Sequence, residues 1–443
     1  MNQKRWLRII PVALIMYTIS YIDRTNISLA LDPKISSMMK DLFMDDEMKG
    51  RLAGIFFIGY VMMQIPGGFL ASRWSARKLI SLCLILWGIF AVGCGLSESF
   101  RQFGWMRFFL GVAESAVFPA TLVLLANWFT KSERARANSY WMLCQPLAVA
   151  GSAPITGWLL SVDWSSAGTA QNLWSHWSEK PLAGWQAMLI VEGCLPFLWL
   201  PVWWFCIRDH PREAKSISVA ERDQLEAALK QEAADLEPTQ QISWFARLAH
   251  PSVFVMVVLY FLHNCAAYGS MTFFTNSLKG QGFSSLQYGL LFAVPYALTA
   301  VLMIINSSHS DKTRERRGHV ALPYLISGTC LILSVVFSSH FWLAYALLCL
   351  AIPGPFVAMA PFWAIPGETL PRSVMGVVMG IVNAFGNLGG FVGNYIVGWL
   401  AKAYHGSNAP GFTALGIGML GCAGLAFLLP KSPRAAGKAA VSA

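Results

Sequence analysis

Two charged side chains, Arg107 and Glu114, lie inside one apolar run that extends to Phe129. They are seven residues apart, and at about 100° per residue this spacing places both on one face of a helix. A run of this length is typical of a helix that crosses a bilayer. Because each charge costs roughly a few kcal/mol at the middle of a membrane, we expect this face to line a cavity.

Arginine and glutamate together could couple the binding of an anion to the binding of a proton. A guanidinium offers a planar fork of donors to a carboxylate substrate and keeps its charge. A carboxylate in a low dielectric has its charged form disfavoured, so Glu114 could hold a proton. Ionised Glu114 would neutralise a nearby arginine, and protonated Glu114 would release that arginine for an anion. The alternative is a permanent Arg107–Glu114 brace.

A second pair of charges, Asp23 and Arg24, lies deep in the first apolar segment, within Tyr21-Ile-Asp-Arg-Thr-Asn26. Neighbouring residues on a helix point about 100° apart, so the two side chains can reach different partners. We interpret them as functional, because charge inside a membrane is costly without a role. The alternative is an ion pair that neutralises itself and fixes helix packing.

Long apolar helices must position these side chains. The chain has 443 residues, of which 55% are hydrophobic and 13% are charged, which indicates an integral membrane protein. Spans of membrane-crossing length predict an all-α protein with twelve transmembrane helices. Their limits are 9–31, 50–71, 79–97, 102–129, 135–161, 185–206, 252–275, 286–306, 319–338, 341–363, 374–401 and 409–429.

The basic residues predict the orientation of these spans. With both termini in the cytoplasm, 23 of the 33 Lys and Arg residues fall in internal tails and loops, against 8 in external loops. The positive-inside rule therefore places both termini in the cytoplasm. The net charge of +10 is then a consequence of topology, and it does not indicate nucleic-acid binding.

The spans divide into two sets of six. We predict an N-terminal bundle at 1–206, a cytoplasmic linker at 207–251, a C-terminal bundle at 252–430 and a cytoplasmic tail at 431–443. In the linker, Ser218-Val-Ala-Glu221 has the spacing of a capping box and predicts a helix to about Ala234. A short interfacial helix is expected from Ile242 onward.

Three motifs resemble those of the major facilitator superfamily, and more narrowly its anion:cation symporter branch. They are the basic turn in Gly68–Lys78, the stretch Arg107-Phe-Phe-Leu-Gly-Val-Ala-Glu114, and Glu133-Arg-Ala-Arg-Ala. The resemblance implies two six-helix bundles around a central cavity. The chain departs from the family at Ser72 and Ser75, where Asp and Gly are usual, so only the second-half basic turn keeps an aspartate, Asp311.

The resemblance also implies roles for single residues. Asp23 matches the family's proton-coupling aspartate, and Arg24 the arginine near substrate. Residues at positions where sugar-acid symporters of this branch contact substrate are Tyr21, Tyr60, Arg107, Gln145, Trp363 and Asn383. We assign proton coupling to Asp23 and Glu114. Glu192 is interpreted as structural and His263 as a packing or cavity-lining residue.

These features predict a proton-coupled symporter that imports a small organic anion, a sugar acid or hydroxycarboxylate, by alternating access. We expect it to act as a monomer in a bacterial inner membrane. No nucleophile–base set or phosphate loop appears, so we predict neither an enzyme nor a bound cofactor. The nine cysteines form no Cys-x-x-Cys pair, so no metal site is expected. The alternatives are an aromatic-carboxylate permease, an anion exchanger and a membrane sensor that transports nothing.

Overall fold

The computed structural model describes residues 3–130, 133, 137, 140–166, 168–214, 217–234, 251–278, 282–369 and 372–430. Every regular element within these ranges is helical. The first half comprises α1 (Gln3–Thr25), α2 (Ile27–Ala30), α3 (Met38–Asp41), α4 (Asp46–Arg73), α5 (Ala76–Gly95), α6 (Phe100–Glu114), α7 (Val117–Trp128), α9 (Cys144–Ser161), α10 (Gly168–Trp174), α11 (Gly184–Gly193) and α12 (Leu195–Cys206), with a 3₁₀ turn at Trp164–Ser166.

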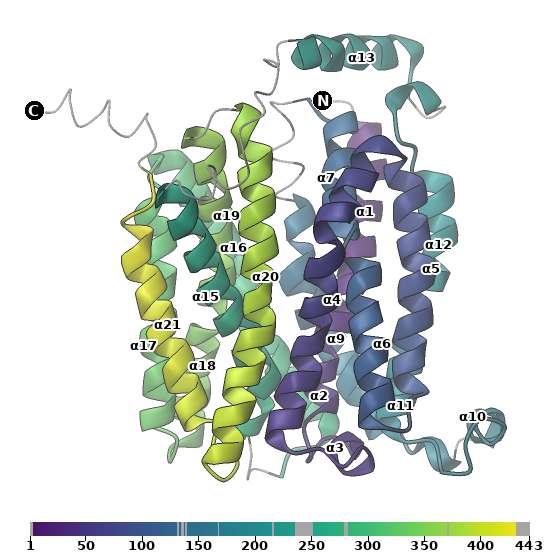
Figure 1. Cartoon of the computed structure of the whole chain (residues 1–443), viewed down its shortest axis with the longest axis vertical. Coiled ribbons are helices and arrows are strands. Elements are labelled where there is room, and N and C mark those ends of the chain that lie inside the picture. Colours follow the sequence, from purple (N-terminus) through teal and green to yellow (C-terminus); the bar gives the residue numbers. More distant parts are fainter. Residues whose placement is uncertain are drawn as a thin grey trace, which may run out of the picture.

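The second half follows a connecting segment that holds α13 (Val219–Ala234) and a 3₁₀ turn at Pro211–Glu213. Its helices are α15 (Pro251–Phe273), α16 (Ser285–Thr313), α17 (Arg317–Val336), α18 (Phe341–Ala351), α19 (Pro353–Thr369), α20 (Arg372–Ala403) and α21 (Ala409–Ala426), with a 3₁₀ turn at Thr275–Leu278. The two halves stand side by side as bundles of nearly parallel rods (Figure 1).

Ten helical stretches among the described residues are long and apolar enough to cross a membrane. Two more helices, α4 with 28 residues and α20 with 32, have ample length and run beside the others (Figure 1). Together they match the twelve spans predicted from the sequence. Several spans are interrupted, since α1 continues as α2, α6 as α7, α11 as α12 and α18 as α19.

The break between α6 and α7 has a local cause. Pro119 has no N–H, so it cannot donate to the carbonyl of Ser115, and its ring crowds that carbonyl. Helix α6 therefore ends at Glu114, and α7 begins at Val117. The interruption places the buried carboxylate of Glu114 at a helix terminus in the middle of a membrane span.

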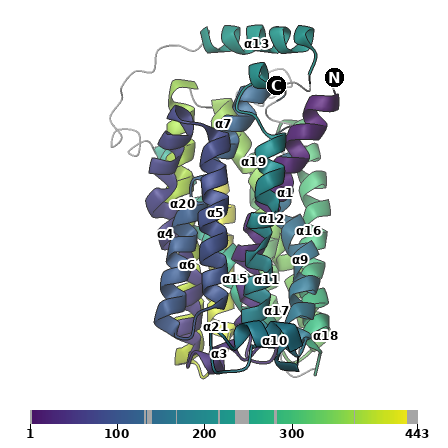
Figure 2. The same cartoon turned by 90° about the vertical axis from the view of Figure 1, so that its right-hand side faces the viewer.

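The two ends of the helix bundle carry different residues and different short helices. The basic end is where α1 begins, and it carries Arg5, Arg77 and Arg316. The opposite end carries α3 and α10, as Figure 2 shows. At the opposite end the halves are joined by Lys402 Nζ, which lies 3.1 Å from Asp45 Oδ2 and 2.9 Å from Glu47 Oε2.

Glycines allow the two halves to pack closely toward the opposite end, where α4 contacts α20 and α9 contacts α16. A Cβ atom on Gly50 would lie 2.4 Å from the main-chain oxygen of Asn394. A Cβ atom on Gly157 would lie 2.5 Å from the main-chain oxygen of Ser285. No side chain fits at either position, so the molecule is in a conformation closed at this end.

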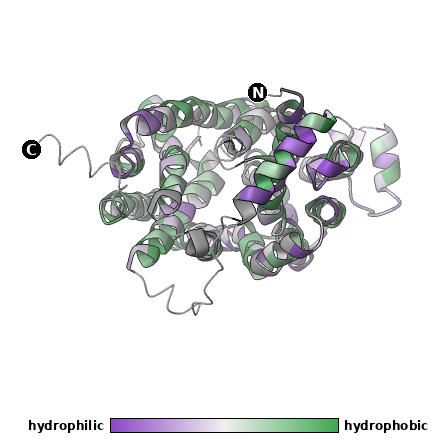
Figure 3. Cartoon of the chain, turned by 90° about the horizontal axis from the view of Figure 1, so that it is seen from above, coloured by the Kyte–Doolittle hydropathy of each residue, from purple (hydrophilic) through white to green (hydrophobic). Residues whose placement is uncertain are grey.

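The connecting segment contains the predicted helix. Helix α13 begins at Val219, and the hydroxyl of Ser218 accepts from the N–H of Glu221 at 3.2 Å, as a capping residue does. The helix lies across the basic end, as the view from above shows (Figure 3). The interfacial helix predicted from Ile242 lies outside the described residues.

One aspartate, Asp209, anchors the first-half basic turn, although serines stand at positions 72 and 75. The carboxylate of Asp209, just past α12, accepts from the Ser75 hydroxyl and from the main-chain N–H of Arg77, the latter at 2.9 Å. The turn has a serine at position 72 where the family usually has an aspartate, but Asp209 from the same half anchors it instead.

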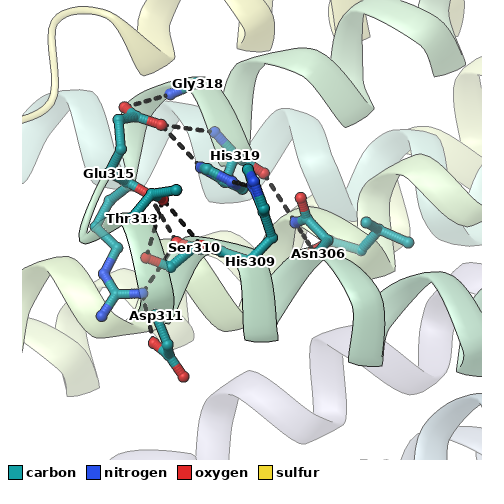
Figure 4. Close-up of polar contacts among 10 residues, drawn as sticks. Asn306, His309, Ser310, Asp311, Thr313, Glu315, Gly318 and His319 are labelled. Atoms are coloured by element: carbon teal, nitrogen blue, oxygen red, sulfur yellow. Dashed lines mark hydrogen bonds and ion pairs between the residues drawn. The ribbon is translucent and has the colours of Figure 1, made fainter.

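The second-half turn is organised differently (Figure 4). Asp311, at the end of α16, pairs with Arg316 of its own turn at 2.7 Å and is largely exposed. Glu315 accepts from the N–H of Gly318 at 2.8 Å and contacts His319 Nδ1 at 2.8 Å. Burial raises the pKa of Glu315, but these two contacts outweigh it and hold the pKa below its ordinary value. The turn is thus closed on itself.

Candidate functional site

A buried ion pair joins α1 to the end of α6. Arg24 Nε donates to Glu114 Oε2 at 2.8 Å, and the side chains are 5% and 0% exposed. Ser20, one turn before Arg24, donates its hydroxyl to the same carboxylate oxygen at 2.7 Å. The second oxygen, Glu114 Oε1, is buried without a partner among the described residues. A proton could therefore be added at Oε1 without breaking an existing hydrogen bond.

The alternative of a permanent Arg107–Glu114 brace is wrong. Arg107 is buried, but its Nη1 donates to the main-chain oxygen of Asp23 at 3.0 Å. Its guanidinium carbon lies 5.2 Å from the centre of the Phe56 ring, and its Nε has no partner among the described residues. Although Arg107 and Glu114 share a helix, the break after Glu114 and the nearness of α1 give that carboxylate to Arg24.

Asp23 and Arg24 have different partners, as the 100° step between them predicts. The indole N–H of Trp87, on α5, donates to Asp23 Oδ2. Both Asp23 and Trp87 are buried. The alternative of an Asp23–Arg24 pair that neutralises itself is therefore wrong, and Asp23 and Glu114 occupy separate sites.

Four aromatic rings surround the Arg24 guanidinium. Its central carbon lies 5.7 Å from the ring centre of Tyr17, 5.1 Å from Tyr21, 5.4 Å from Phe56 and 4.7 Å from Tyr60. Ring faces stabilise a cation but supply no full negative charge. Glu114 is thus the one carboxylate bonded to Arg24 among the described residues, and an incoming anion would compete with it.

A small cavity of about 20 Å³ lies between the halves. Its described lining residues are Tyr21, Met142, Gln145, Tyr260, His263, Asn264, Ala267, Tyr268, Phe356, Met359 and Trp363. Of the predicted substrate-contacting residues, this lining contains Tyr21, Gln145 and Trp363. Tyr21 links the cavity to the ion pair, because its ring lies against Arg24 and its hydroxyl is 3.4 Å from that of Tyr268.

The other predicted substrate residues are not among the described lining residues of the cavity. Tyr60 belongs to the rings around Arg24, and Arg107 is hydrogen-bonded to the Asp23 backbone. Asn383 accepts from Asn387 Nδ2 at 3.3 Å, and that nitrogen also lies 3.4 Å from Gln64 Oε1 across the interface. This amide chain connects α20 to α4.

Glu192 has only neutral partners. Asn26 donates to Glu192 Oε2 at 2.7 Å and Thr156 to Oε1 at 2.6 Å, all three within the first half. This arrangement agrees with the structural role expected from the sequence. Among the described residues, no group of three or more His, Cys, Asp or Glu side chains is placed to hold a metal ion.

Sequence reasoning missed part of the second-half wall. Tyr260 and Asn264 line the cavity but were not singled out, whereas His263 was expected there. The signal was available, because Tyr260, Asn264 and Tyr268 recur every four residues and so share one face of α15. Unlike a buried charge, a stripe of neutral side chains has no large burial cost that would identify it as unusual in the sequence.

Comparisons with known proteins find membrane transporters. The family model of the Major Facilitator Superfamily matches residues 13–394. A "Putative tartrate transporter" of Agrobacterium vitis is 30% identical, covering 92% of this chain and 90% of its own. A "Quinolone resistance transporter" of Acinetobacter baumannii is 29% identical, covering 93% and 91%.

A solved structure shares the fold. It is a bacterial homologue of the human lysosomal transporter Spinster, in an inward-facing and unoccupied conformation, with a TM-score of 0.73 and 18% identity. The match covers 97% of this chain and 96% of that one. At this identity the likeness concerns the fold alone.

Proposed function

The chain belongs to the Major Facilitator Superfamily, and we propose on that premise that it is a proton-coupled symporter of a small organic anion. The predicted family resemblance is confirmed, and the relatives are membrane transporters rather than enzymes. Sugar acids and hydroxycarboxylates are the proposed substrates. One relative is named for tartrate, a hydroxycarboxylate that carries two carboxylates.

The Arg24–Glu114 pair is the observation that carries this proposal. The pair is buried, and Glu114 holds the arginine at 2.8 Å. When Glu114 takes up a proton, its attraction for Arg24 falls and the guanidinium becomes available to a substrate carboxylate. Proton and anion then bind together, which is the requirement for symport.

Asp23 and Arg107 form the second part of the proposed machinery. Asp23 is held by Trp87 and is the other proton-coupling acid in this proposal. Arg107 is buried beside it with an unpartnered Nε, and we assign it to the substrate as a second cation. Tyr21, Tyr60, Gln145, Trp363 and Asn383 would contribute neutral contacts to the substrate, as the family resemblance implies.

The proposed transport cycle is alternating access between the two bundles. The present conformation is closed at the opposite end, by Lys402 and by glycine-mediated packing. We propose that the basic end is cytoplasmic, because Lys and Arg favour that side. The protein would then reside in a bacterial inner membrane, as a monomer.

Two transport alternatives remain to be separated by experiment. An anion exchanger would need the arginines but not Asp23 or Glu114. An aromatic-carboxylate permease is favoured by the rings of the cavity wall, such as Tyr260 and Trp363. A membrane sensor, the alternative from another class, would bind an anion without moving it.

Uptake of radiolabelled organic acids into proteoliposomes tests the proposal. We expect accumulation driven by an inwardly directed proton gradient, its loss when an uncoupler collapses the gradient, and its loss in Arg24→Ala. An anion exchanger would keep transporting after collapse of the gradient, provided that a counter-anion is inside. Full proton-driven accumulation in both Glu114→Gln and Arg107→Ala would contradict the coupling scheme.

A further inference from the structure

The second half supplies a neutral wall to the central cavity. Its lining residues come from α15 (Tyr260, His263, Asn264, Ala267 and Tyr268) and from α19 (Phe356, Met359 and Trp363). None of the described lining residues, from either half, is an acid, a lysine or an arginine. Arg24, which lies against the lining residue Tyr21, and the buried Arg107 both belong to the first half.

His263 is the most specific polar feature of this wall. The ring is 4% exposed and its Nδ1 lies 3.0 Å from the hydroxyl of Tyr324 on α17. It stacks on Tyr260 with ring centres 5.2 Å apart and an angle of 10° between planes. The ring is thus held from two sides in one orientation.

The second ring nitrogen of His263 is left for a ligand. Nε2 lies on the far side of the imidazole from Nδ1, so it points away from Tyr324, and His263 lines the cavity. Within the described residues Nε2 has no hydrogen-bond partner. A ring nitrogen of a cavity-lining histidine that has no protein partner can hydrogen-bond to a substrate group.

The charge distribution limits what that substrate group can be. A carboxylate placed against His263 would be buried without a counter-ion, which is strongly disfavoured. A hydroxyl or a ring edge carries no such penalty, and the flanking rings offer apolar faces to it. Nothing bonded to or stacked on the imidazole carries a negative charge that would stabilise its cationic form.

We propose that the transported anion is a monocarboxylate whose uncharged end lies against His263 in the neutral second-half wall. The substrate carboxylate faces the arginines of the first half, and its uncharged end meets His263 Nε2. This inference rests on the proposed function, because it presumes that an organic anion occupies the cavity.

Matched pairs of acids provide the test. D-gluconate and D-glucarate differ at one terminus, which is a hydroxymethyl group or a carboxylate. Nicotinate and pyridine-3,5-dicarboxylate form an aromatic pair. In proteoliposome uptake and in thermal-shift binding, we expect the wild type to prefer the monocarboxylate of at least one pair by ~10-fold or more. His263→Arg, which places a cation in the wall, should reduce that preference at least ~10-fold.

Controls separate a local effect from a general one. His340→Arg adds the same charge at an exposed site at the opposite end, and the preference should not change. His263→Leu removes the hydrogen bond without adding charge, so it should raise the KM of the preferred monocarboxylate while the proton dependence of uptake is kept. This variant also serves if His263→Arg does not fold.

The possible results separate a failure of this inference from a failure of the proposed transport function. Equal handling of both members of each pair by the wild type would overturn the inference and leave anion transport standing. An unchanged KM in His263→Leu, or an unchanged preference in folded His263→Arg, would also overturn it. If none of the four acids binds or is transported, the organic-anion function itself is contradicted.

Discussion

Replacing Glu114 by Gln should separate anion binding from proton coupling. Glutamine keeps the shape of the protonated acid and can still accept from Ser20, but it cannot neutralise Arg24. In the wild type a substrate carboxylate must compete with Glu114 for the guanidinium at 2.8 Å. In Glu114→Gln that competitor is absent at every pH.

The size of the effect follows from the burial of the pair. Removing one partner of a buried ion pair costs about 3–5 kcal/mol, largely because a charge is left without a counter-ion. A substrate anion that replaces the lost carboxylate recovers part of this cost. A recovery of about 3 kcal/mol corresponds to roughly 100-fold tighter binding at a pH where wild-type Glu114 is ionised.

The assay compares binding and transport in the same preparation. Isothermal titration in detergent should show affinity that rises as pH falls in the wild type, and affinity that is higher and depends less on pH in Glu114→Gln. Counterflow in proteoliposomes should persist in the variant, whereas accumulation driven by a proton gradient should be lost.

Glu192→Gln is the matched control. Glu192 is also a buried carboxylate of the first half, but its partners are the neutral Asn26 and Thr156. This variant should keep wild-type affinity, pH dependence and accumulation. The reasoning is refuted if Glu114→Gln binds the anion with wild-type affinity and pH dependence, or if Glu192→Gln reproduces its behaviour.

Three further predictions concern the bundle and its orientation. Gly157→Ala should push the halves apart at the opposite end at a cost of about 1–3 kcal/mol, so a cysteine placed between them there is labelled faster. Gly151→Ala, on the same helix with open space, should not change the labelling. Asp209→Ala should lower the stability by ~1–3 kcal/mol through the loss of two hydrogen bonds, whereas Asp311→Ala should lower it by less than ~1 kcal/mol. Tryptophan fluorescence on heating measures both, and equal losses would contradict the difference between the turns. Ser218→Cys should resist a membrane-impermeant maleimide in intact cells and react after permeabilisation; labelling in intact cells would reverse the proposed topology.

Much of the fold could be predicted from local sequence. Apolar runs of span length predict crossing helices because lipid cannot satisfy an exposed backbone. The capping spacing at Ser218 predicted the start of α13, because an N-cap acts within one helical turn. The buried charges were identified as candidates for the same local reason, which is that lipid does not tolerate them without partners.

The pairing of those charges required the tertiary structure. The helical period places Arg107 and Glu114 on one face, but it does not say which neighbouring helix that face meets. Helix packing brings Arg24 to Glu114 across 90 residues of sequence, and it brings Trp87 to Asp23 across 64.

The cavity was decided by tertiary structure for a related reason. Its wall joins Tyr21 of α1 to residues of α15 and α19, and most of these side chains are neutral. A neutral polar or aromatic residue in an apolar run is compatible with packing, with a lipid-facing position or with a binding site. The sequence by itself therefore determined which residues are costly to bury, and the packing of the two bundles decided which of them meet and what faces the substrate.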